Sequence, residues 1–180
     1  MLKNMRDSLR VRLALSLLVI AGPAWSETFT GQIVHVADGD TITLLTQSRQ
    51  QIRIRIAGID APERAQPFGN RSRQSLHDLC NEKTATVQDE GKDRYGRTIG
   101  NVTCAGIDAN AEQVRRGMAW VYDRYTKLGS PLYALQEQAR AGGAGLWADA
   151  KPTPPWEWRR KVKAKNLNSP TRSPKTQCKG

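Results

Sequence analysis

The chain alternates between apolar and polar residues with the short period that is typical of β-strands. Residues 51–56 carry an isoleucine at every second position, so one face of the predicted strand is apolar and the other carries Arg53 and Arg55. The Asp38-Gly39 pair is a turn signal between two earlier apolar runs. The sequence predicts five strands in all, at residues 29–36, 41–45, 51–56, 84–88 and 98–103.

Three segments show helical spacing instead, at residues 69–81, 108–119 and 130–143. The last of these begins at Ser130-Pro131, an N-cap followed by proline at the first helical position, and stops at two glycines. Five short strands with a helix after the third are the layout of an OB-fold. The predicted class is therefore α+β, mainly β: a five-stranded OB-fold barrel with three helices. A small α+β sandwich is the competing architecture.

The first 26 residues have the composition of a signal peptide. A basic start is followed by an apolar run at Leu13–Gly22, which is short for a membrane span, and by small residues at Ala24 and Ser26. We expect cleavage near Ser26; the alternative is an uncleaved N-terminal anchor. Cleavage leaves a mature form without a membrane segment, located in the periplasm or secreted.

The rest of the chain divides into one folded domain, residues 27–150, and a basic tail, residues 151–180. The tail contains prolines and tryptophans, and Trp156 and Trp158 are expected to pack back on the domain as a clasp. From Arg159 onward it has little to bury, so it is predicted to be largely disordered. The formal net charge of +11 over 180 residues favours a polyanionic partner, and a merely basic protein is the alternative.

Export also sets an expectation for the three cysteines, because thiols pair in oxidising compartments. Cys178 lies in the predicted tail, so Cys80 and Cys104 are the expected disulfide. The sequence has no C-x-x-C spacing and two histidines, which argues against a zinc site.

Two aspartates at strand ends indicate a cation site. Asp40 follows the Asp38-Gly39 turn, and Asp60 follows the 51–56 strand. Carboxylates brought together repel each other unless a cation lies between them, and oxygen ligands suit calcium or magnesium. Ala61 has only its backbone carbonyl to contribute. Each aspartate taken alone is more typical of a turn.

Three further residues are candidate catalytic groups. Glu63 is held at a set separation from Asp60 by the proline between them, and is placed to deprotonate a water. Arg55 and Arg97 are suited to stabilise the negative charge of a five-coordinate phosphorus. The alternatives are a loop salt bridge from Glu63 to Arg64 and two ordinary surface arginines.

Four residues are candidates for binding a nucleic-acid strand. Arg94 and Tyr95 are placed to bind a neighbouring phosphate, and Tyr122 and Tyr125 to stack on bases. The tyrosines serve equally well as packing aromatics.

These motifs resemble the staphylococcal nuclease (thermonuclease) family over Phe29–Trp147. The resemblance rests on Asp38 to Thr41, on Arg55 and the Asp60-Ala61-Pro62-Glu63 run, on Asp93 to Arg97, and on residues 110–119. It implies a calcium-dependent phosphodiesterase that cleaves DNA and RNA to 3′-phosphate products. An activated water is the expected nucleophile, and single-stranded DNA or RNA is the expected preferred partner.

By position, the resemblance implies Asp40, Asp60 and the Ala61 carbonyl as calcium ligands. It implies Arg55, Glu63 and Arg97 as the catalytic residues, and Arg94 and Tyr95 as the site of a terminal phosphate. Ala61 replaces the threonine of the best-known member, and of the two base-stacking tyrosines only Tyr125 has a clear match. The protein is expected to be a monomer. A non-catalytic nucleic-acid-binding OB module and an accessory factor of DNA transfer are the alternative functions.

Overall fold

The computed structural model of the chain describes residues 27–167. The predicted signal peptide, Cys178 and the end of the basic tail lie outside the described residues. Within residues 27–167, no helix combines the length and the apolar character needed to cross a membrane.

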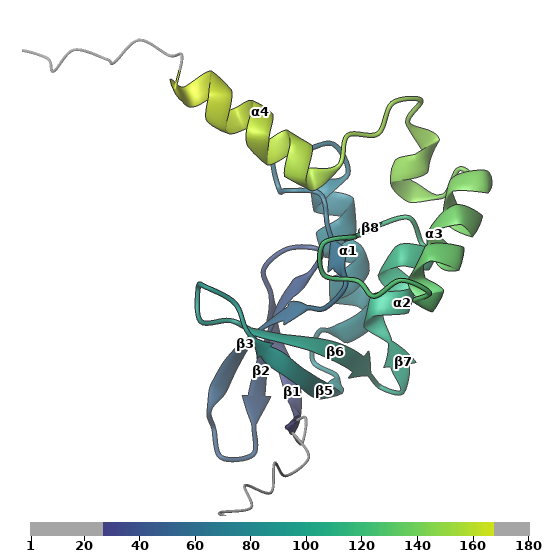
Figure 1. Ribbon diagram of the computed structural model, residues 1–180. Helices are drawn as coiled ribbons and strands as arrows, with labels where there is room; N and C mark the ends of the chain where they lie inside the picture. The colour runs from purple at the N-terminus through teal and green to yellow at the C-terminus, as the bar shows by residue number, and fades with distance from the viewer. Residues whose placement is uncertain (1–26, 168–180) are drawn as a thin grey trace, which may run out of the picture.

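Five strands close into a barrel in the lower part of Figure 1: β1 (Thr28–Val36), β2 (Thr41–Thr46), β3 (Gln51–Ile56), β5 (Thr84–Lys92) and β6 (Thr98–Cys104). Neighbouring strands are antiparallel in the order β3-β2-β1-β5-β6, and a parallel pairing of β3 with β6 closes the ring. This arrangement confirms the predicted OB-fold of α+β class.

The alternation along β3 places its side chains as expected. Ile54 and Ile56 are fully buried in the core, Ile52 is partly buried, and Arg55 lines a cleft on the other face. β5 runs past the predicted end at residue 88, through a bulge between Asp89 and Gly91. This extension carries the β5–β6 loop out to the same cleft.

Four α-helices lie in the described part of the chain, where the sequence predicts three: α1 (Gly69–Cys80), α2 (Ala109–Arg115), α3 (Pro131–Ala141) and α4 (Pro155–Leu167). A 3₁₀ helix, η1 (Gly145–Ala148), follows α3. Helix α2 ends at Arg115 instead of residue 119, because Gly117 adopts a φ of +63° that a right-handed helix does not allow.

Three short strands complete the fold. After Gly117 the chain enters β8 (Trp120–Val121), which pairs with β4 (Ile59–Asp60) outside the barrel, and β7 (Ile107–Asp108) extends the sheet beside β6. The β4–β8 pairing places Asp60 opposite Trp120. The backbone of Asp60, a predicted site residue, is therefore held by pairing with a strand that is distant in the sequence.

Helix α4 corrects the prediction for the tail. Residues from Arg159 onward were expected to be disordered, but residues 155–167 are helical and lie above the barrel in Figure 1. Pro155 stands at the first helical position, where its fixed φ and missing N–H favour a helix start. The expected clasp is present at Trp156, whose ring packs edge-on against Trp120 at 5.8 Å between centroids.

A disulfide joins the end of α1 to the end of β6. Cys80 and Cys104 are bonded and fully buried, and they are separated by 24 residues in the sequence. The bond ties the helix inserted after the third barrel strand to the last barrel strand.

Removing this disulfide is expected to lower stability strongly. Replacing both Cys80 and Cys104 by serine should reduce the free energy of unfolding by about 3 kcal/mol, because the closed loop no longer restricts the unfolded chain. Urea unfolding followed by tryptophan fluorescence measures this loss. Wild-type protein under a reducing agent serves as the control and should match the double variant; an unchanged midpoint in both would contradict the prediction.

Candidate active site

The turn that carries Asp40 is held by two helices. A Cβ atom at Gly39 would lie 1.8 Å from Ser72 Oγ of α1, so only glycine allows this close approach. Gln113 of α2 donates a hydrogen bond from Nε2 to the Gly39 carbonyl at 2.8 Å. These contacts fix the turn before β2 and with it the position of Asp40, the residue after Gly39.

Two carboxylates and one guanidinium meet at the centre of the site. Arg55 Nη2 lies 3.1 Å from Asp40 Oδ2 and 2.9 Å from Asp60 Oδ1. Arg55 Nη1 donates to the carbonyls of Ile56 and Ile59 at 2.9 and 2.8 Å. The Ala61 N–H donates to Asp40 Oδ2 at 2.6 Å. The two aspartates, far apart in sequence, therefore direct oxygens toward one positively charged atom.

Burial makes this acidic cluster costly to ionise. Burial, together with the charge and side chain of Asp40, raises the pKa of Asp38 to about 7. Burial also raises the pKa of Asp60, and the negative charge of Asp40 raises it further. A hydrogen bond from Arg159 and the positive charge of Arg55 act in the opposite direction and only partly offset the rise. A positive charge next to these aspartates therefore stabilises their ionised carboxylates.

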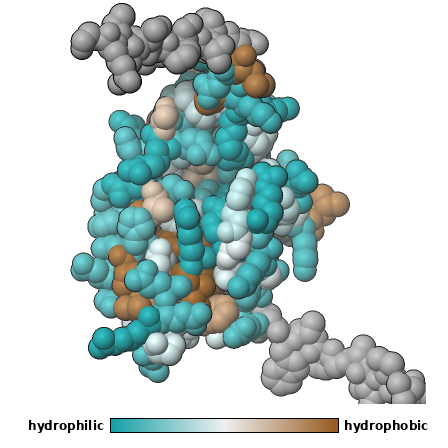
Figure 2. Space-filling view, turned by 90° about the vertical axis from the view of Figure 1, so that its left-hand side faces the viewer, coloured by the Kyte–Doolittle hydropathy of each residue, from teal (hydrophilic) through white to brown (hydrophobic). Residues whose placement is uncertain are grey.

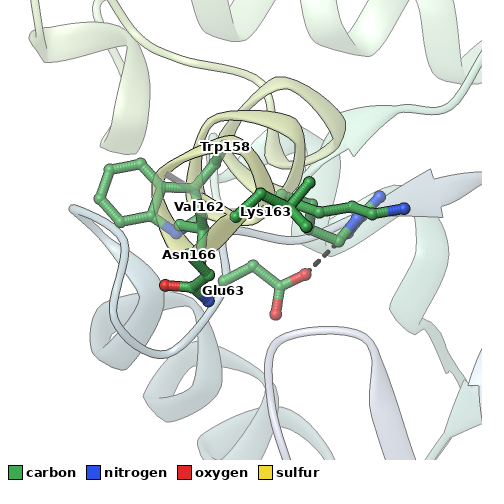
Figure 3. A pocket seen from close by; sticks show the side chains of 7 residues that line it. Glu63, Trp158, Val162, Lys163 and Asn166 are labelled. Atoms are coloured by element: carbon green, nitrogen blue, oxygen red, sulfur yellow. Dashed lines mark hydrogen bonds and ion pairs between the residues drawn. The ribbon is translucent and has the colours of Figure 1, made fainter. Parts of the chain in front are cut away.

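Glu63 stands at the edge of the cluster, where it is open to solvent. Its side chain is 42% exposed, and its backbone N–H donates to Gln66 Oε1 at 3.2 Å. Its Oε1 lies 2.7 Å from Arg159 Nη1 of α4. Figure 3 shows the Glu63 carboxylate facing the side chains of α4, with a dashed line on this contact.

Arg97 comes to the site on the β5–β6 loop. Its Nε and Nη2 each lie 2.7 Å from Asp93 Oδ2, and its Nη1 lies 3.5 Å from Thr41 Oγ1. Burial acts to raise the pKa of Asp93, but hydrogen bonds from Arg97 and from the Tyr95 N–H outweigh it and lower that pKa. Asp93 thus remains ionised and holds the guanidinium beside the first residue of β2.

The four candidates for binding a nucleic-acid strand all line the same cleft. Arg94 donates to the Tyr95 hydroxyl at 2.6 Å, and the Tyr95 side chain is 68% exposed. Tyr125 is 62% exposed. Tyr122 stacks on Trp156 with ring centroids 5.4 Å apart and planes at 12°, so one of its faces is covered. Tyr125 therefore offers the more open ring for a base.

The structure places every sequence-predicted site residue along one cleft of about 670 Å³. The face of the molecule shown in Figure 2 is mostly hydrophilic. The predicted residues that line the cleft are Asp40, Arg55, Asp60, Ala61, Glu63, Arg94, Tyr95, Arg97, Tyr122 and Tyr125.

The sequence reasoning missed three residues of this site. Asp38 was treated as a turn residue, Asp93 as part of a motif, and Arg159 as part of a disordered tail, yet all three line the cleft. Pro155, followed by fourteen residues without glycine or proline, is the signal that would have indicated a helix around Arg159.

The donor set fits a hard divalent cation. The carboxylate of Asp60 is 2% exposed and that of Asp40 9%, and both already contact the same cationic nitrogen. Carboxylate and carbonyl oxygens are the ligands that calcium prefers. The carboxylates of Asp40 and Asp60 are thus chemically suitable ligands, and Glu63 lines the same cleft.

Comparison with known proteins points to one family. A family model described as staphylococcal nuclease homologue matches residues 53–149. The chain is 44% identical over 138 residues to a Haemophilus influenzae protein named "Uncharacterized endonuclease", with 76% of each chain covered. It is 40% identical over 173 residues to "Micrococcal nuclease" of Shigella flexneri, covering 90% of this chain and 98% of that protein.

Proposed function

The chain belongs to the staphylococcal nuclease family, and on that premise we propose that it is a calcium-dependent phosphodiesterase that hydrolyses DNA and RNA to products with 3′-phosphate ends. Membership in the family supports nuclease activity. The observation that carries the finer proposal is the convergence of Asp40 Oδ2 and Asp60 Oδ1 on Arg55 Nη2, in a cleft shared with Glu63 and Arg97.

Each residue of the cleft has a proposed role in one displacement at phosphorus. Glu63 accepts a proton from the attacking water, whose oxygen bonds to phosphorus as the bond to the 5′-oxygen breaks. The 5′-oxygen leaves with a proton from solvent, and the phosphate remains on the 3′ side. Arg55 and Arg97 stabilise the charge that develops on the phosphoryl oxygens.

Calcium, when bound by Asp40, Asp60 and the Ala61 carbonyl, supplies Lewis acidity toward the phosphate and the water. The protein holds the two arginines in place before substrate arrives. Arg55 is fixed by two backbone carbonyls, and Arg97 by Asp93. Groups that are already oriented cost little reorganisation as the reaction proceeds.

The substrate is proposed to be a single strand of DNA or RNA. Arg94 and Tyr95 are placed to bind a phosphate next to the cleaved one, and the exposed ring of Tyr125 to stack on a base. The aromatic rings favour unpaired bases, whose faces are accessible. We propose that the protein acts as a monomer in the periplasm or the medium; the disulfide supports an oxidising compartment.

Cleavage should depend on calcium. Purified protein lacking residues 1–26 is incubated with end-labelled single-stranded DNA or RNA, once with calcium and once with a chelator. We expect cleavage with calcium, products whose 3′ ends a phosphatase can dephosphorylate, and loss of activity to background with the chelator. Binding without cleavage under calcium, magnesium or manganese would instead support the alternative of a nucleic-acid-binding module.

A further inference from the structure

Helix α4 is anchored at the rim of the cleft by contacts at its first turn. Pro155 is buried, and the Trp156 ring stacks on Tyr122 and packs edge-on against Trp120. Just before the helix, Gln66 donates from Nε2 to the Thr153 carbonyl at 2.5 Å. These contacts fix where the next turn of the helix lies, and that turn carries Arg159.

Arg159 reaches two of the acidic residues of the site. Its Nη2 lies 2.7 Å from Asp60 Oδ2, and its Nη1 lies 3.2 Å from Asp60 Oδ1 and 2.7 Å from Glu63 Oε1. The contact with Asp60 is the two-pronged geometry in which a guanidinium binds a carboxylate most firmly. The Arg159 side chain is 44% exposed, so it has solvent on one side into which it can move.

The contacts of Arg159 conflict with those that the proposed reaction needs. Asp60 is the proposed cation ligand, and Arg159 contacts both of its oxygens while Arg55 holds one of them. A calcium ion binds carboxylate oxygens at about 2.3–2.6 Å, so it would touch the guanidinium, and the two positive charges would repel. Glu63 Oε1, the proposed proton acceptor, is occupied by the same guanidinium.

We propose that Arg159 is a further active-site residue that competes with the divalent cation for Asp60 and also covers Glu63. This inference rests on the proposed function, since it takes Asp60 as a cation ligand. Cation binding releases the Arg159 guanidinium from both carboxylates, while α4 stays anchored through Trp156. Arg159 thereby sets the cation concentration at which the site becomes active.

The adjacent residue provides a matched control. Arg160 is the next residue of α4 and carries the same charge, but its side chain is 73% exposed and it pairs with Glu157 at 3.9 Å. Arg160→Gln therefore changes the net charge of the protein as Arg159→Gln does, without touching Asp60 or Glu63.

The test is a calorimetric titration of calcium into the cation-free protein in the absence of nucleic acid. We expect Arg159→Gln to bind calcium about five- to tenfold more tightly than wild type, as expected for the loss of half-exposed ion pairs. Arg160→Gln should bind as wild type does. Arg159→Lys, which keeps the charge but loses the two-pronged contact, should lie between wild type and Arg159→Gln.

Three results would overturn the inference, and they are distinguishable. Equal calcium affinity in wild type and Arg159→Gln would show that Arg159 does not compete with the cation, and it would leave the proposed function intact. Equal tightening in Arg159→Gln and Arg160→Gln would reduce the effect to net charge. No calcium binding by any variant would overturn the cation site itself, and the competition with it. Circular dichroism checks that each variant folds. If Arg159→Gln does not fold, the calcium affinity of Arg159→Lys relative to wild type decides the test.

Discussion

Replacing Glu63 by glutamine is expected to lower kcat for cleavage of single-stranded DNA by a factor of about 10²–10⁴, the usual contribution of a general base. Glutamine has the size of glutamate but cannot accept the proton of the attacking water. The substrate affinity should change little, because Glu63 is placed to act on the water and not on the strand. Steady-state kinetics at saturating calcium, with 3′-phosphate products as the readout, measures the loss.

The control for this variant is the same chemical change at a distant position. Glu137 lies on α3 with its side chain 63% exposed and pairs with Arg140, so Glu137→Gln should keep wild-type kinetics. Glu63→Gln also removes a charged partner of Arg159. If Glu63→Gln kept wild-type kcat while folding normally, another group would have to accept the proton, and the role proposed here for Glu63 would be wrong.

Replacing Arg97 by glutamine is expected to lower kcat by a factor of about 10²–10³, as for the loss of one donor that stabilises transition-state charge. The expected cause is local. Arg97 is held by Asp93 beside Thr41, so its guanidinium lies at the part of the cleft where β2 begins, next to Asp40. The fall in kcat/KM should match the fall in kcat, because the interaction strengthens only in the transition state.

Two further variants separate chemistry from general charge. Arg53 lies on β3 and is exposed, so Arg53→Gln removes an arginine from the same barrel without touching the cleft lining. Asp93→Asn keeps Arg97 but weakens the contact that orients it, so its loss of kcat should be smaller than that of Arg97→Gln. A loss in Arg53→Gln as large as that in Arg97→Gln would show that the effect is nonspecific electrostatics.

Local sequence patterns were sufficient to predict most strands of the barrel. The period-two alternation of residues 51–56 placed Ile54 and Ile56 in the core and Arg55 outside it, because neighbouring side chains of a strand point to opposite faces. The Ser130-Pro131 start of α3 is present in the structure, where Ser130 Oγ accepts from the Leu132 N–H. These signals act between residues close in sequence, so one sequence is enough to read them.

Local patterns also misled at two places. The expected helix at residues 108–119 ends early, since one glycine with a positive φ outweighs the helical spacing around it. Helix α4 was missed because its sequence is basic and has no continuous apolar face, and periodicity is the signal on which such a prediction depends. Its position depends on Trp156 meeting Tyr122 and Trp120, which are distant in the chain.

The sequence by itself determined which residue types are present for the chemistry: the carboxylates, the arginines and the strands that carry them. Only the tertiary structure decided which of them touch. Asp40 accepts from the backbone of Ala61 across 21 residues, and Arg159 reaches Glu63 across 96. Such contacts depend on how the barrel closes and where a distant helix packs, and that is set by the packing of the whole domain and not by the spacing of residues along the chain.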